Sequence, residues 1–173
     1  MRYRNLPLAV ASWALIAAQP VLLVFLLVDG GGLSRPWDAV LATALPAALA
    51  WIFRRFGVSP RVYTEDDRLV VVNPFVTYDV PLRSAHPVGR SGGSAVTVDG
   101  IGEVFLWAMS LSVFDGGQVR NARRTVRRLA KEARATEPAT EPARAARTLR
   151  IEWPDLLLLP LLAIAVWLLA TSH

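Results

Sequence analysis

An apolar stretch over residues 6–28, with no charged side chain in it, limits the folds open to this chain more than any other feature. As an α-helix rising about 1.5 Å per residue, it is long enough to cross the roughly 30 Å hydrocarbon core of a bilayer. The alternative is a secretory signal peptide, because Arg2 and Arg4 form a basic start. The apolar part of a signal peptide usually has about 7 to 15 residues, and no Ala-x-Ala-like cleavage site follows this one, so we predict a transmembrane helix.

A second apolar segment, at residues 37–53, follows a turn rich in glycine that also contains Pro36. Glycine and proline destabilise the interior of a helix, so we predict a tight hairpin here and a second helix that returns across the bilayer. Arg54 and Arg55 close this helix and would stop it at the membrane face. Residues 1–55 therefore predict a transmembrane hairpin.

A third apolar segment lies within residues 153–172. Its uninterrupted apolar part would cover about 22 Å as a helix, so its ends should lie at the membrane interfaces, and a half-inserted helix is the alternative. The chain has 53% hydrophobic residues, above the roughly 45–50% that is usual for a soluble domain, and this surplus suits surface that faces lipid. We predict three transmembrane helices.

The arginines predict the orientation of these helices. Basic residues precede the first segment, follow the second and precede the third, whereas the hairpin holds Arg35 against Asp29 and Asp38. Loops on the cytoplasmic side carry the excess of Lys and Arg. The prediction is a multi-pass plasma-membrane protein with a cytoplasmic middle domain and the C-terminus outside.

Residues 57–135 differ from the apolar segments, because short runs rich in Val, Thr and aromatic residues alternate with turn residues. This pattern predicts an antiparallel β-structure. Asp99-Gly100 between apolar runs indicates a hairpin, and residues 83–94 should form a loop with at most one brief strand. The predicted strands cover residues 61–64, 68–73, 75–80, 95–98 and 103–109.

After Asp115-Gly116-Gly117 the apolar period becomes that of an α-helix, which should close the core of the sheet. Its apolar face consists of Val119, Ala122, Val126, Leu129, Ala130 and Ala133. A basic stripe lies away from that face and consists of Arg120, Arg124, Arg127, Lys131 and Arg134. The stripe is either an ordinary solvated surface or a site that binds lipid or a partner. Residues 136–150 are predicted to be a polar linker.

Residues 69–81 contain a strand, an Asn-Pro turn, a second strand and a Val-Pro ending. This stretch resembles the signature of bacterial PH-domain-containing membrane proteins, in particular the PH domain of the actinobacterial low-molecular-weight protein antigen type. The resemblance covers residues 57–135 and implies a small α+β PH-like domain, with antiparallel strands and one C-terminal amphipathic helix, attached to membrane spans. Two features depart from the signature: Leu82 stands where an aromatic residue is frequent, and Tyr78 and Asp79 occupy a strand that is usually basic.

The first predicted hairpin of the domain carries Glu65, Asp66 and Asp67, which would repel a phosphorylated headgroup. We therefore expect no specific inositol-phosphate site. His86 is the one histidine before the C-terminal residue, cysteine is absent, and no metal-ligand or nucleophile motif is present. The sequence therefore predicts no enzyme, no catalytic residue, no metal and no cofactor.

Two functions remain for the middle domain. The first is an interaction module that docks other membrane proteins, or itself as a homo-oligomer, on the cytoplasmic face. The second is electrostatic binding of anionic membrane lipids through the arginine-rich helix. Nucleic acid is not an expected partner, because no aromatic platform accompanies the basic residues.

Overall fold

The computed structural model describes residues 1–29, 36–87, 94–110, 116–136, 144–156, 163 and 167. The chain divides into two compact units. One unit contains Met1–Ala9 and Ser59–Arg150 and is an α+β domain. The other contains Val10–Val58 and Ile151–His173, and its described part is helical.

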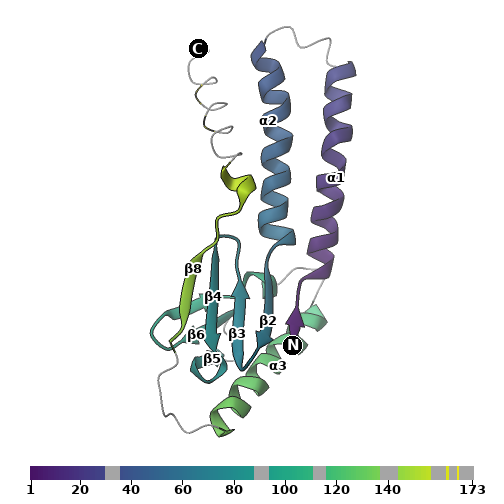
Figure 1. The fold of residues 1–173 in the computed structure, drawn as a ribbon. Helices are drawn as coiled ribbons and strands as arrows, with labels where there is room; N and C mark the ends of the chain where they lie inside the picture. The colour runs from purple at the N-terminus through teal and green to yellow at the C-terminus, as the bar shows by residue number, and fades with distance from the viewer. Residues whose placement is uncertain are drawn as a thin grey trace. The chain divides into compact units, whose positions relative to one another are not determined.

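The α+β domain contains a five-stranded antiparallel sheet in the order β1-β2-β3-β4-β8 (Figure 1). Its centre is a meander of β2 (Arg61–Glu65), β3 (Arg68–Val72) and β4 (Val76–Pro81). The short strand β1 (Arg2–Tyr3) pairs with β2, and β8 (Ala146–Leu149) pairs with β4. Both edges of the meander are therefore covered, which leaves fewer unpaired backbone groups on its strands.

A second, three-stranded sheet has the order β5-β6-β7. It consists of β5 (Ala85–Pro87), β6 (Ala95–Val98) and β7 (Gly102–Phe105), all antiparallel. The β6–β7 hairpin turns at the predicted Asp99-Gly100, where Gly100 has φ +79°, a left-handed conformation that glycine adopts without strain. Helix α3 (Gly116–Thr136) follows the second sheet.

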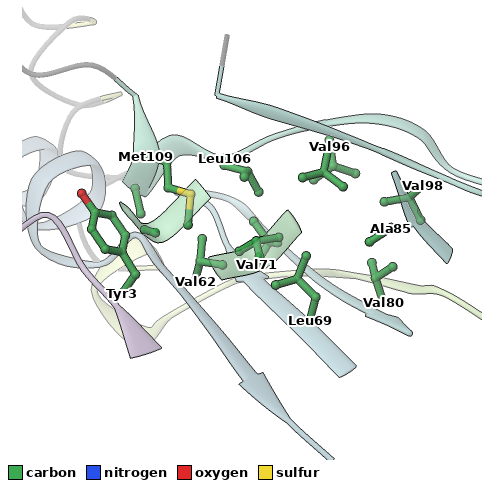
Figure 2. Close-up of a cluster of buried hydrophobic side chains, with 14 of the residues drawn as sticks. Tyr3, Val62, Leu69, Val71, Val80, Ala85, Val96, Val98, Leu106 and Met109 are labelled. Carbon is green, nitrogen blue, oxygen red and sulfur yellow. The ribbon is translucent and has the colours of Figure 1, made fainter. Parts of the chain in front are cut away.

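The two sheets and α3 share one core of buried side chains, half of which are valine (Figure 2). Burial alternates along β6, where Val96 and Val98 are buried and Thr97 between them is exposed. Such alternation is what a strand with one solvent-facing side requires. The residues of the core with at most 2% exposure include Val62, Leu69, Val71, Val80, Val96, Val98, Val104, Met109, Val119 and Val126.

The predicted α+β class of the middle domain is confirmed, and so are most of its elements. The strands predicted at 61–64, 68–73, 75–80 and 95–98 match β2, β3, β4 and β6 to within one residue at each end. The strand predicted at 103–109 ends at Phe105, because Trp107–Met109 form a 3-10 turn. The predicted apolar face of α3 is buried or half-buried against the core throughout.

The polar linker predicted at residues 136–150 is wrong over Ala146–Leu149, which form β8. All four residues of β8 are exposed, so no alternation of apolar residues could reveal the strand. The predicted domain at 57–135 also lacks β1, which belongs to the same sheet. Both strands exist because the meander offers them open edges to pair with.

Asn73, from the Asn-Pro turn, ties the two sheets together. Its Nδ2 donates to the carbonyl oxygen of Phe105 at 2.6 Å, and its Oδ1 accepts from the backbone N–H of Trp107 at 3.1 Å. Its own backbone N–H donates to the Val76 carbonyl at 2.9 Å and closes the β3–β4 turn. The Asn of the signature thus has a structural role in this domain.

In the helical unit, α1 (Leu6–Asp29) is followed by α2 (Pro36–Ile52), which continues into a π-helical turn at Phe53–Val58. Residues Leu6–Phe25 of α1 are long and apolar enough to cross a membrane, a property that a signal sequence shares. Apolar side chains of α1 are largely exposed, among them Val10 at 66% and Val21 at 71%. A buried core helix of a soluble protein would not expose them.

We predicted three transmembrane helices. In the described part of the chain, α1 is the one helix that is long and apolar enough to be a candidate span. Helix α2 has 17 residues and would cover about 26 Å, which is less than a typical hydrocarbon core of roughly 30 Å. Most of the segment predicted at 153–172 lies outside the described residues.

We predict that Asn73→Ala lowers the free energy of unfolding of the α+β domain by about 1–3 kcal/mol, because the Trp107 N–H and the Phe105 carbonyl lose their partner. The measurement is chemical unfolding of the full chain in detergent, followed by circular dichroism in the β-region. Asn121→Ala, the same change at an exposed position of α3, is the control. Equal stability of the two variants would contradict the role of Asn73.

Candidate functional site

The basic stripe predicted from the sequence lies on the outer face of α3. All five of its residues, Arg120, Arg124, Arg127, Lys131 and Arg134, are exposed. Over its whole length α3 carries seven basic residues against one acidic residue, Glu132. The opposite face of α3 is held in the core, so the helix geometry directs the stripe outward.

Arg123 lies outside the stripe and has a structural role. Its Nη2 donates to Ser94 Oγ at 2.6 Å and to the Met109 carbonyl at 3.2 Å. Ser94 Oγ also donates to the same carbonyl. These contacts fasten the first half of α3 to the segments that flank β6 and β7.

The last residue of the stripe, Arg134, contacts the second sheet. Its Nη1 lies 3.1 Å from Nδ1 of His86, and Nε2 of His86 lies 3.1 Å from Oδ2 of Asp99. A guanidinium can only donate, so Nδ1 of His86 must accept and Nε2 must carry the proton that is donated to Asp99. This chain of contacts sets the direction of the Arg134 side chain.

A groove of about 480 Å³ lies between the last turns of α3 and the β2–β3 turn. Asp66 and Asp67 from that turn line it together with Glu132 of α3, and Arg68 and Arg83 supply the opposite charge. Asp66 and Asp67 have φ of 43° and 57°, a left-handed turn that Asp tolerates. A groove with both signs of charge is a poor site for a phosphorylated headgroup.

Within the described ranges, no group of three or more His, Asp or Glu side chains lies close enough to hold a metal ion. The stripe itself contains no nucleophile or acid–base pair of the kind that catalysis needs. What the stripe offers chemically is a row of guanidinium groups, which bind carboxylates and phosphates through paired hydrogen bonds.

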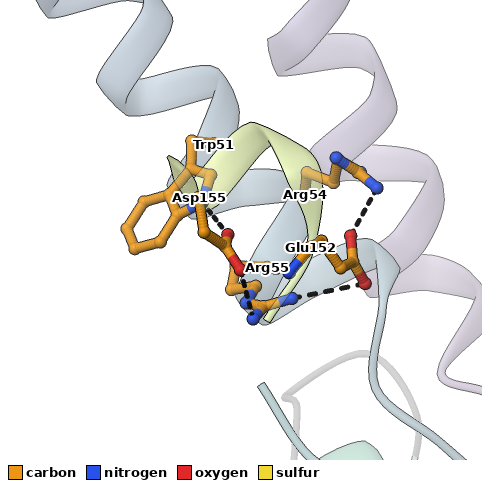
Figure 3. A network of polar contacts seen from close by, with 5 residues as sticks. All are labelled: Trp51, Arg54, Arg55, Glu152 and Asp155. Atoms are coloured by element: carbon orange, nitrogen blue, oxygen red, sulfur yellow. Dashed lines mark hydrogen bonds and ion pairs between the residues drawn. The ribbon is translucent and has the colours of Figure 1, made fainter. Parts of the chain in front are cut away.

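The helical unit contains a network of charges that the sequence analysis missed (Figure 3). Arg55 Nη2 lies 2.7 Å from Oδ2 of Asp155, and Arg55 Nη1 lies 3.3 Å from Oε1 of Glu152. Arg54 contacts Glu152 at 2.5 Å, and Trp51 Nε1 donates to Oδ1 of Asp155 at 2.6 Å. The network ties the end of α2 to the turn that precedes the last apolar segment.

The two central side chains of this network are withdrawn from water, since Arg55 is 3% exposed and Asp155 is 9% exposed. Buried ions of this kind need their partners, because an uncompensated buried charge is strongly unfavourable. The sequence does contain a signal, since two arginines after the second apolar segment match two acids before the third. That signal is equally expected from membrane topology alone.

Comparison of the chain with protein-family models, with curated proteins and with solved structures finds no match. The resemblance of residues 69–81 to bacterial PH-domain membrane proteins therefore stays a prediction.

We predict that Asp155→Asn lowers the stability of the helical unit by about 3 kcal/mol, because the amide keeps the volume of Asp155 but leaves Arg55 without its closest counter-charge. The measurement is titration of the full chain in micelles with a denaturing detergent. Asp99→Asn is the matched control, because the Asp99 side chain is 68% exposed and its loss should change stability by less than about 1 kcal/mol. Equal effects of the two substitutions would show that the network contributes little.

Proposed function

We propose that this chain is a membrane-anchored, PH-like interaction module that docks other membrane proteins, or a second copy of itself, on the cytoplasmic face of the plasma membrane. Helix α1 and the two further predicted spans would provide the anchor. The succession of two three-stranded meanders, β2–β4 and β5–β7, and one C-terminal helix supports the PH-like part of the proposal.

The observation that carries the docking proposal is the exposed basic stripe of α3. Packing of the opposite face keeps the helix in place, so the stripe is presented on a rigid element rather than on a loop. Surfaces rich in Arg are frequent in protein interfaces, and their charge selects partners with acidic surfaces. We therefore expect the partner to contribute Asp and Glu side chains.

The strand register of the first sheet favours a protein, rather than a lipid surface, as the partner of the basic stripe on α3. Tyr3 pairs with Val62 at the start of β2, Arg61 pairs with Val72, and Val76 pairs with Leu149. Strands β1, β2 and β8 thus all connect to the apolar segments at one end of the sheet. We call this the connection end, and it comprises Tyr3, Arg61, Val72, Val76 and Leu149. With three connections to membrane segments, this end should face the bilayer.

Helix α3 leads away from the connection end. Its first half contacts Met109, close to the Trp107 that bonds Asn73 at the connection end, and its last turns line the groove beside Asp66 and Asp67 at the other end. From Arg120 to Arg134 the helix rises about 21 Å. Because charges are screened over about 8 Å at physiological salt, a bilayer below the connection end would attract only the first part of the stripe. A protein beside the domain could contact all of it.

The test is crosslinking of the full-length chain in native membranes, with identification of the proteins recovered. We predict that Arg124→Glu with Arg127→Glu lowers recovery of specific partners at least tenfold, which corresponds to about 1.4 kcal/mol of binding free energy. Arg144→Glu with Arg147→Glu reverses the same number of exposed arginines outside α3 and should leave recovery unchanged, provided that protease accessibility shows the same topology as for the original chain.

Two results would count against this proposal. Recovery of the same proteins with both double variants would remove the stripe as a docking surface. A loss of salt-sensitive binding to anionic vesicles by the α3 variant, without any change in the proteins recovered, would instead favour electrostatic lipid binding through the arginine-rich helix.

A further inference from the structure

The connection end exposes large apolar side chains that come from three separate elements. Phe75 from the β3–β4 turn is 43% exposed, Phe105 at the end of β7 is 46% exposed, and Leu149 at the end of β8 is 71% exposed. Isolated apolar residues are common on protein surfaces, but a cluster of them marks a surface that contacts something.

Hydrogen bonds and register bring these three residues to the same end of the domain. Asn73, two residues before Phe75, bonds to the carbonyl of Phe105 at 2.6 Å. Leu149 pairs with Val76, and the Arg150 N–H donates to the carbonyl of Phe75 at 2.8 Å. Their positions are therefore set by the sheet and its turn.

The aromatic rings at this end are held in place. Phe105 and Trp107 pack edge to face, with ring centroids 5.9 Å apart and an interplanar angle of 71°. Such a geometry is favourable for two aromatic rings. Trp is enriched at the headgroup level of membranes, and Phe and Leu are frequent on the apolar face of elements that lie in the membrane interface.

The exposed acidic residues of the first sheet gather at the end opposite to the connection end. Arg4, Arg61 and Arg150 adjoin the strands at the connection end. The opposite end carries the exposed acidic β2–β3 turn, Glu65, Asp66 and Asp67. An anionic headgroup layer attracts the first end, whereas the opposite end offers it exposed carboxylates beside Arg68 and Arg83 and so no net attraction. The apolar side chains and the basic residues of the connection end thus both favour contact with an anionic membrane surface.

We propose that the connection end is a membrane-contact surface, in which Phe75, Phe105 and Leu149 insert into the headgroup region of the bilayer. The domain then stands on the membrane with the acidic turn away from lipid, and the basic stripe of α3 faces sideways toward partners. This inference rests on the membrane anchoring in the proposed function, and it adds a contact between the folded domain and lipid.

The absence of cysteine from the chain allows a direct test. Single substitutions, Phe75→Cys, Phe105→Cys, Asp66→Cys and Leu15→Cys, are labelled with an environment-sensitive fluorophore. Each full-length protein is reconstituted into vesicles of equimolar phosphatidylcholine and phosphatidylglycerol, without quencher or with lipids that carry a quencher near the headgroup, for positions 66, 75 and 105, or deep in the acyl chains, for position 15. Leu15 in α1 reports insertion of the anchor, and Asp66 reports the opposite end of the domain.

We expect quenching and a blue shift of the label at positions 75 and 105, quenching at position 15, and neither change at position 66. Quenching at 15 without quenching at 75 and 105 would overturn the membrane-contact surface and leave the proposed anchoring intact. No quenching at 15 would overturn both. Equal quenching at 66 and 75 would show a domain that lies on its side, which also overturns the inference.

Leu149→Cys gives a second position on the same surface if Phe75→Cys or Phe105→Cys fails to fold, which circular dichroism reports. Because Leu149 is already largely exposed, its replacement removes little packing. Its label should be quenched as those at 75 and 105 are. An unquenched label at 149, in a folded protein whose label at 15 is quenched, would again overturn the membrane-contact surface.

Discussion

The packing of two small sheets and one helix around a valine-rich core holds the α+β domain together and sets the orientation of α3. Val80 from the first sheet and Val119 from α3 have no exposed surface, and Val98 from the second sheet is 2% exposed. Full burial of such side chains stabilises the fold by about 1.5–3 kcal/mol each. Because this contact holds α3 by its apolar face, the charged face of the helix is turned to the outside.

The second constraint is covalent. Three strands of the first sheet are joined to apolar segments through short links, and the antiparallel register brings these three connections to one end. A domain attached in this way has one end near lipid, if the apolar segments span the membrane as we propose. The charge distribution suits that arrangement, because the end with the connections is basic and apolar while the opposite turn is acidic.

The charge network of the helical unit also joins residues that are far apart in the chain. Arg55 and Asp155 lie 100 residues apart in the chain and form an ion pair with little exposure to water. A buried pair of this kind adds little net stability compared with an apolar pair, but it disfavours arrangements in which either ion lacks its partner. In this unit the pair joins the turn at the end of α2 to the turn that contains Glu152 and Asp155.

Side-chain periodicity was enough to predict most of the elements. Period-two burial marks β6, and the period of 3.6 residues marks α3, because each pattern records which side chains face the core. The same helical geometry places Arg120, Arg124 and Lys131 on one stripe, so this candidate site could be predicted from residue spacing alone.

Only the tertiary structure decided the two short edge strands and the contacts between distant parts of the chain. Strand β1 has two residues, too few for a periodic pattern, and β8 has four residues, all of them exposed; both form because the edges of β2 and β4 are open to them. The ion pair of Arg55 with Asp155 and the hydrogen bond from Asn73 to the Phe105 carbonyl join residues that are distant in the chain. Local periodicity carries no information about such pairs, because it reports how each segment meets the core and not which other segment it meets.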